Sequence, residues 1–350
     1  MKLRSLTFAL VFLLVACGGA AAPAGSNASA PVPSAAKPAA SSPVSSGTAT
    51  NITVALSSLS ATNIPSWVGQ DAGIFQKNGL NAGFKVIPGG SVTTSSLLGG
   101  DVQIVMGGGS EALGAAVGGA DLVIVGITTP TYTFIIEGPP AAKTLADLKG
   151  KTFGVPAARG TVDVATRVAL KSQGIDPEKD VKITALGSVQ AVSAALISHA
   201  IDAAAVNVPD NLSAEANGLH PVFNTAAAKL PAASNSIYVT RSYAASHRDV
   251  VQRYVDSVVQ SIARIGTDKP LTVAAIKKNL KVEDPAAEAT YEFFKSGVFP
   301  VLPYPKIEYF EDAKQTVGEQ NPKVLSFDIS KILDPSFVQS AADRGLDKSR

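Results

Sequence analysis

The feature that most constrains the fold is an alternation of short apolar runs with helical patterns, which begins abruptly at Asn51. After the first run, seven further runs have the length and side-chain content of strands. They cover residues 82–87, 102–106, 122–127, 152–155, 181–185, 203–206 and 237–240. The predicted helices cover 64–77, 94–98, 111–117, 145–148, 162–172, 189–198 and 248–265, and then 273–279, 286–295, 307–317 and 335–343. This alternation predicts the α/β class, with doubly wound and mostly parallel sheets.

A weak internal repeat predicts two lobes of similar construction. Residues 96–104 can be laid over residues 195–203, and both segments indicate the end of a helix, a tight reversal and a buried strand. His199 then stands where the first copy has Gly100, and we expect it to be a turn histidine that faces solvent. A length of 350 residues, roughly twice that of a typical domain, agrees with two lobes.

The first residues have the pattern of a secretory signal. Lys2 and Arg4 precede an apolar run at 6–15, and the four residues that end in Cys17 resemble the lipobox of bacterial lipoproteins. We therefore expect a signal peptide at 1–16 and lipidation of Cys17, which would anchor the chain through acyl chains such as palmitate. The alternative is an ordinary signal peptide with a chance cysteine. Residues 17–50, almost entirely Ala, Ser, Pro and Gly, are predicted to be a disordered tether.

The amino-acid composition excludes several kinds of binding and metal sites. Without Lys2 and Arg4, 28 basic residues balance 28 acidic ones, so no broad positive field is available for a nucleic acid. One cysteine and three histidines exclude an internal disulfide, a cysteine-clustered zinc site and an iron–sulfur cluster. The sequence contains no recognisable catalytic or metal-binding spacing. We therefore expect no enzymatic activity, no cofactor and no metal.

Several segments resemble the nitrate/sulfonate/taurine and thiamine-pyrimidine-precursor binding proteins, which are the substrate-binding components of bacterial ABC importers. The most specific is IPSWVGQDAGIF at 64–75, followed by NGL at 78–80, and LADLKGKTFGV at 145–155 and RGT at 159–161 are also similar. The resemblance extends over about 52–240. It implies a two-lobed type II periplasmic-binding-protein fold, with a helical C-terminal region packed on lobe one. Lobe one would comprise 52–134 and 238–350 and lobe two 138–235, with crossovers near 132–138 and 234–238.

Loops that follow strands are the candidate ligand contacts, because open α/β sheets bind ligands beyond the carboxyl ends of their strands. In lobe one they are a polar segment after the first strand, a pair of glycines and a serine, and a run of three glycines before a helix. The candidates there are Leu59, Ser60, Thr62, Gly90, Ser91, Gly109 and Ser110. For the first segment, the alternative is that Thr62 or Asn63 simply caps a helix.

In lobe two the strongest candidate is an anion cradle formed by Arg159, Gly160 and Thr161 at the start of a helix. The alternative is a solvated Arg159 paired with Asp163. Asn207, at the end of a predicted strand, would face the same cleft. Trp67 and Tyr132, with Phe134, could form an aromatic wall, or Trp67 could pack in the core.

These observations predict a lipoprotein, in the periplasm or on the outer face of the cytoplasmic membrane, that captures a small anionic or dipolar solute. Sulfonates, nitrate, carboxylates and pyrimidine-like compounds all fit. The implied partners are an ABC permease and its ATPase, and the protein itself is expected to be a monomer. One alternative is a lipoprotein that presents the solute to a sensor receptor. Another, a pyrimidine-synthase-like enzyme, is disfavoured because those enzymes depend on a cysteine-rich stretch and histidines.

Overall fold

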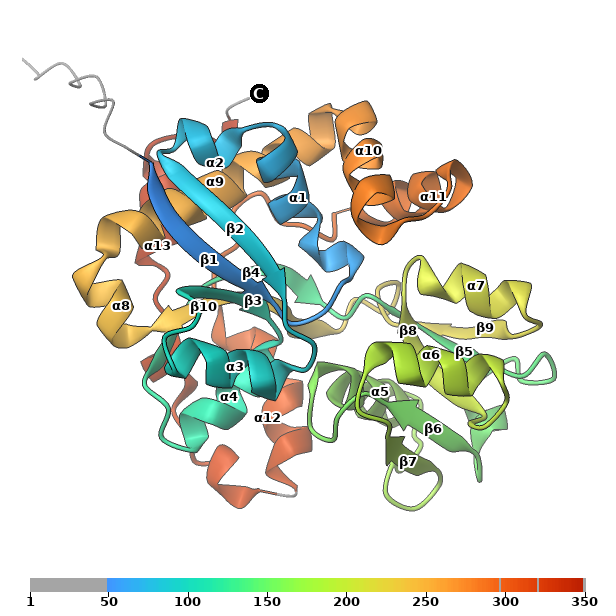
Figure 1. The fold of residues 1–350 in the computed structure, drawn as a ribbon. Helices are drawn as coiled ribbons and strands as arrows, with labels where there is room; N and C mark the ends of the chain where they lie inside the picture. The colour runs from blue at the N-terminus through green and yellow to red at the C-terminus, as the bar shows by residue number, and fades with distance from the viewer. Residues whose placement is uncertain (1–48, 296, 320, 349–350) are drawn as a thin grey trace, which may run out of the picture. The chain divides into compact units, whose positions relative to one another are not determined.

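The structure, a computed structural model, describes residues 49–348 except 296 and 320. The predicted signal peptide, Cys17 and nearly all of the tether lie outside the described residues. Two five-stranded sheets organise the rest, and they lie in the left and right halves of Figure 1. The prediction of the α/β class with two lobes is confirmed.

The first sheet has the strand order β2-β1-β3-β10-β4. β1 pairs in parallel with β2 and with β3, whereas β10 runs antiparallel to both β3 and β4. Its strands are β1 (Thr50–Leu56), β2 (Leu80–Val86), β3 (Ile104–Gly107), β4 (Leu122–Thr131) and β10 (Pro231–Thr240). The sheet is therefore mostly parallel, with one reversed strand inserted next to its edge.

The second sheet repeats this plan with the order β7-β6-β8-β5-β9. β6 pairs in parallel with β7 and β8, and β5 is the reversed strand. Its strands are β5 (Phe134–Gly138), β6 (Thr152–Val155), β7 (Lys182–Ala185), β8 (Ala203–Asn207) and β9 (His220–Asn224). The chain passes between the sheets twice, at residues 132–133 and at 225–230.

The predicted repeat is confirmed in backbone detail. Gly100 and His199 both adopt left-handed conformations, with φ of 85° and 57°. The amide of the next residue returns to the helix in each copy, from Asp101 to the carbonyl of Ser96 and from Ala200 to that of Ala195, at 3.0 and 2.8 Å. The side chain of His199 is exposed, as expected.

Helices flank both sheets. In the lobe of the first sheet they are α1 (Ile64–Asp71), α2 (Ile74–Lys77), α3 (Gly90–Leu98), α4 (Gly109–Val117), α8 (Arg241–Ser246), α9 (Arg248–Thr267), α10 (Lys269–Leu280), α11 (Asp284–Lys295), α12 (Glu311–Gly318) and α13 (Ser336–Asp343). In the lobe of the second sheet they are α5 (Thr161–Ser172), α6 (Val189–Ile197) and α7 (Asp210–Ala216). Short 3-10 turns lie at Ala61–Asn63, Leu145–Leu148, Ile307–Phe310, Pro322–Val324, Ile329–Ile332 and Leu346–Lys348.

Some sequence predictions of helices were wrong in detail. The single helix expected over 64–77 is broken into α1 and α2, because Gly73 takes a left-handed conformation with φ of 67°. The segment 145–148 is a 3-10 turn closed by a capping box between Thr144 and Asp147. The helix expected over 307–317 begins as a 3-10 turn and becomes α12 only at Glu311.

The long helix α9 explains how the C-terminal region joins the first lobe. It packs against α1, α2 and α13, and its buried face contributes Tyr254, Val258 and Ile262 to the core. α12 lies elsewhere and contacts α5 of the second lobe. Within residues 49–348, no helix combines the length and the hydropathy that crossing a bilayer requires.

Candidate functional site

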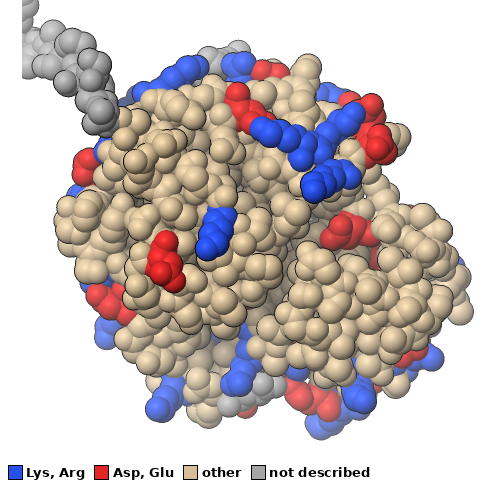
Figure 2. Space-filling view, in the orientation of Figure 1, with Lys and Arg blue, Asp and Glu red and all other residues tan. Residues whose placement is uncertain are grey.

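A cleft lies where residues of the two lobes face one another, with a cavity volume of about 120 Å³. That is room for a solute of several heavy atoms, since a single water needs on the order of 10–15 Å³. Figure 2 shows the hollow between the lobes, and most of the surface around it carries no charged side chain. The lining combines hydroxyls and side-chain amides with a few apolar groups.

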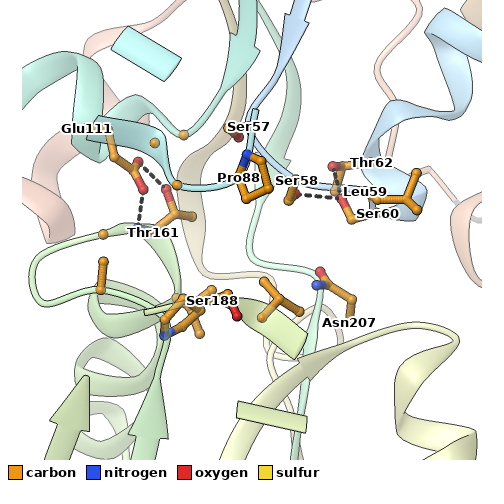
Figure 3. Close-up of a pocket in the computed structure, with 18 of the residues that line it drawn as sticks. Ser57, Ser58, Leu59, Ser60, Thr62, Pro88, Glu111, Thr161, Ser188 and Asn207 are labelled. Atoms are coloured by element: carbon orange, nitrogen blue, oxygen red, sulfur yellow. Dashed lines mark hydrogen bonds between the residues drawn. The ribbon is translucent and has the colours of Figure 1, made fainter. Parts of the chain in front are cut away.

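The first lobe contributes the loop after β1. Its residues Ser57, Ser58, Leu59, Ser60 and Thr62 line the cleft, and Figure 3 shows them along one side of it. The hydroxyls of Ser60 and Thr62 are 2.7 Å apart, and the hydroxyl of Ser58 donates to that of Ser60 at 3.4 Å. This loop therefore presents a short chain of connected hydroxyls to a solute.

Asn63 takes the N-cap position of α1, but its side chain does not make the expected capping hydrogen bond. Neither the 3-10 turn nor α1 has a side-chain cap. Instead, the Asn63 side-chain amide donates to the carbonyl of Ser58 at 2.7 Å, and that of Asn235 donates to the carbonyl of Thr62 at 3.0 Å. Both amides therefore fix the shape of the loop, and both residues also line the cleft.

A carboxylate bridges the two lobes at the edge of the cleft. Glu111, on α4 of the first lobe, accepts hydrogen bonds from the backbone N–H of Thr161 at 3.0 Å and from its hydroxyl at 2.8 Å. Thr161 is the first residue of α5 in the second lobe, and Figure 3 shows both bonds. The start of α5, predicted as an anion cradle, thus does bind an anion, but the anion belongs to the protein.

Glycines make room for this bridge. A Cβ at Gly108 would lie 1.9 Å from the Thr161 hydroxyl and 2.0 Å from Glu111 Oε2. A Cβ at Gly90 would lie 2.4 Å from Glu111 Cγ, and one at Gly160 would lie 3.1 Å from Oε1. The close approach of the lobes here depends on residues without a side chain.

Of the predicted site residues, Leu59, Ser60, Thr62, Gly90, Gly160, Thr161 and Asn207 line the cleft, and so does Phe134. The structure brings these residues together from five loops and strands of both lobes. The rule that ligand contacts follow strand ends explains most of them, because the loops after β1, β2 and β6 all open into the same space.

Four predicted ligand contacts, Ser91, Gly109, Ser110 and Arg159, are absent from the lining. Ser91 and Arg159 are exposed outside it, and Arg159 uses its backbone N–H, not its guanidinium, to bind Asp163 at 2.7 Å. The guanidinium that pairs with Asp163 belongs to Arg167. Gly109 faces β10, where a Cβ would lie 2.4 Å from that of Ala233, and Ser110 is buried beside it.

Of the three residues suggested for an aromatic wall, Trp67 and Tyr132 are absent from the cleft lining. Trp67 and Tyr132 are each only 2% exposed and pack in the hydrophobic cores. Burial raises the pKa of the Tyr132 hydroxyl, and the negative charges of Asp312 and Glu111 raise it further. Among the described residues that line the cleft, Phe134 is the only one with an aromatic ring.

The sequence analysis missed several lining residues. Ser188 and Gln190 follow β7 and begin α6, so the strand-end rule could have found them. Ser234 and Asn235 lie within the reversed strand β10, where that rule gives no signal. Glu111 carries no local signal of its role, because its partner Thr161 is 50 positions away in the other lobe.

The cleft offers mainly groups that form hydrogen bonds. Its lining contains hydroxyls, amides, apolar groups and the carboxylate of Glu111, but no histidine, cysteine, lysine or arginine among the residues the structure describes. No group of three or more histidine, cysteine, aspartate or glutamate side chains in that part of the chain could hold a metal ion.

The paired sheets with reversed crossover strands and the cleft between them define a two-lobed α/β protein of the type II periplasmic-binding-protein fold. The family described as NMT1/THI5 like matches residues 61–268, more than half of the chain. The chain belongs to this family. A search of curated proteins finds no match.

Solved structures share the fold at low identity. One is the alkanesulfonate-binding protein SsuA from Xanthomonas axonopodis pv. citri bound to MOPS, with 17% identity, a TM-score of 0.68, and 83% of this chain and 99% of that chain covered. Another is the periplasmic nitrate-binding protein NrtA from Synechocystis PCC 6803, with 12% identity and a TM-score of 0.65. The match covers 85% of this chain and 89% of that chain. The desulfurization enzyme DSZB is also similar, with 16% identity and a TM-score of 0.60. That match covers 85% of this chain and 99% of the enzyme's chain. The fold is therefore shared by binding proteins and by an enzyme.

Proposed function

We propose that this chain is the solute-binding component of an ABC importer, which captures a small polar solute between its lobes and delivers it to a permease and ATPase. The observation that carries this proposal is a cleft lined from both lobes by hydroxyls and amides and bridged at its edge by Glu111 and Thr161. The family assignment supports it, as does the shared fold of the alkanesulfonate-binding and nitrate-binding proteins.

Binding, without catalysis, is the activity we assign to the cleft. No histidine, lysine or cysteine lines the cleft in the described part of the chain, and both oxygens of its one carboxylate, Glu111, accept hydrogen bonds from Thr161. This arrangement favours the binding proteins of this fold over its enzyme. Of the anionic and dipolar solutes that the sequence favours, the lining supports the dipolar class. Hydroxyls and amides can both donate and accept hydrogen bonds, and no cationic side chain lines the cleft in the described part of the chain.

The location and the cycle follow from this proposal. Lipidation of Cys17 would hold the protein at the outer face of the cytoplasmic membrane or in the periplasm, with residues 17–50 as the tether. The monomeric protein would be open without solute. A solute that contacts both lobes shifts the equilibrium toward the closed form, which the permease then recognises.

Native mass spectrometry of protein purified from its own host tests this function. We expect a co-purified small solute and, after its removal and re-addition, a decrease in the radius of gyration by small-angle scattering. A protein that carries no solute, and that neither binds nor compacts with a broad panel of polar solutes, would contradict the proposal.

A further inference from the structure

Glu111 is the single ionisable side chain among the residues that the structure shows lining the cleft. The other polar groups there are neutral: the hydroxyls of serines and threonines, and the side-chain amides of Asn63, Gln190, Asn207 and Asn235. No lysine, arginine or histidine of the described lining offsets the carboxylate. The charge that a bound solute meets is therefore negative.

The position of the carboxylate matters as much as its charge. Its two oxygens accept hydrogen bonds from the backbone N–H and the hydroxyl of Thr161, in the first turn of a helix of 12 residues. Such a helix start, with free N–H groups and the positive end of the helix dipole, is where an anionic ligand would otherwise be stabilised. Glu111 fills that position from the opposite lobe.

The position is built for this side chain. Gly90, Gly108 and Gly160 surround it, and a Cβ at any of the three would lie within about 3 Å of a Glu111 or Thr161 side-chain atom. Each carboxylate oxygen accepts one hydrogen bond from Thr161 and keeps a further lone pair. The carboxylate thus repels a second anion and can accept hydrogen bonds from a donor on the solute.

Resting on the solute-binding function proposed above, we infer that Glu111 is a specificity-determining residue: it excludes anionic solutes and selects neutral or cationic solutes that bear N–H or O–H donors. The carboxylate acts in two ways. It occupies the helix start that an anion needs, and it supplies a hydrogen-bond acceptor in a cleft whose other groups are neutral. This inference assigns the opposite charge preference to the one that Arg159 suggested in the sequence.

A matched pair of probes tests it, ethanesulfonate and ethylammonium, which have the same two-carbon chain and opposite charges. Isothermal titration would compare the wild type with Glu111→Ala, which opens the helix start, and with Glu111→Gln, which removes the charge but keeps the shape. Glu283→Ala, on the exposed surface, controls for the change in net charge. Circular dichroism confirms that each variant is folded.

We expect both Glu111 variants to bind ethanesulfonate at least about tenfold more tightly than the wild type and the control, and to bind ethylammonium more weakly. The inference is overturned if the wild type binds ethanesulfonate as tightly as the Glu111 variants do, or if the native solute found by mass spectrometry is an anion. In either case solute capture itself stands. The absence of any co-purified solute and of any compaction would instead remove the proposed function.

Discussion

Gly100 and His199 occupy the same place in the two lobes, each left-handed at the reversal between a helix and a buried strand. A non-glycine residue pays about 1–2 kcal/mol for this conformation, because its Cβ approaches the following carbonyl. The two lobes therefore share one backbone conformation at this turn, but only Gly100 adopts it without steric strain.

Substitution of His199 and substitution of Gly100 should change the free energy of unfolding in opposite directions. We expect His199→Gly to raise the free energy of unfolding by roughly 0.5–1 kcal/mol, since the relief of strain exceeds the added entropy of the unfolded chain. Gly100→Ala should lower it by about 1 kcal/mol. Urea denaturation measures both, and a loss of stability in His199→Gly would show that the histidine makes a contact that compensates for its strain.

Gly108→Ala should prevent the lobes from approaching fully. The added methyl group would meet the Thr161 hydroxyl and Glu111 Oε2 at about 2 Å, while the backbone at Gly108 is extended and tolerates alanine. We expect at least about tenfold weaker binding of the co-purified solute and a smaller decrease in the radius of gyration. Gly114→Ala on the same helix, where a Cβ meets nothing within 4 Å, is the matched control. Normal compaction of Gly108→Ala would contradict this expectation.

Substitutions of Arg159 and of Thr161 should have different effects on the affinity for the solute. Arg159→Ala is expected to change solute affinity by less than about twofold, because the guanidinium lies outside the cleft and an exposed charge contributes little. Thr161→Val keeps the shape but removes the hydroxyl that donates to Glu111, and it should weaken binding by about three- to tenfold. Calorimetry with the co-purified solute distinguishes them. A large loss in Arg159→Ala would restore this residue to the site.

Glu137, on β5, should make stability depend on pH. It is fully buried, and within the described residues neither carboxylate oxygen has a hydrogen-bond partner. Burial, and then repulsion by Glu215, raises the pKa of Glu137 from 4.5 to about 8. The folded protein therefore holds a proton that the unfolded chain releases between these values. The free energy of unfolding should fall as pH rises from about 4.5 to about 8.

Glu137→Gln should flatten that part of the curve, because the amide does not titrate. Urea denaturation at pH 5, 6.5 and 8.5 would compare it with the wild type and with Glu283→Gln at an exposed position. If the variant follows the same pH dependence as the wild type, another group is responsible.

The sequence was most informative where local patterns decide the structure. Alternation of apolar runs and helical patterns predicts the five strands of the first sheet and three of the second, but not β5 or β9. The strand-end rule predicts loops around Ser60, Gly90 and Thr161 that do meet in the cleft. It failed where the direction of a side chain depends on distant packing. Ser110 lies close in sequence to lining residues, yet it is buried away from the cleft lining.

The charge of the cleft could not be predicted from the sequence either, because it also depends on contacts between residues that are far apart in the chain. Arg159 is adjacent to the start of α5, and sequence proximity suggested that it would recruit an anion there. The contact that forms is between Thr161 and Glu111, which are brought together only by the approach of the two lobes. A long-range pair of this kind leaves no periodic or local signature.

The burial of Trp67 has a practical consequence for spectroscopy. It is the chain's only tryptophan, and it is sealed in the core of the first lobe without contributing to the cleft lining. A solute that enters the cleft has no indole to quench by collision, so intrinsic emission is a poor titration signal. A fluorophore attached at position 188, on the mouth of the second lobe, would report occupancy directly.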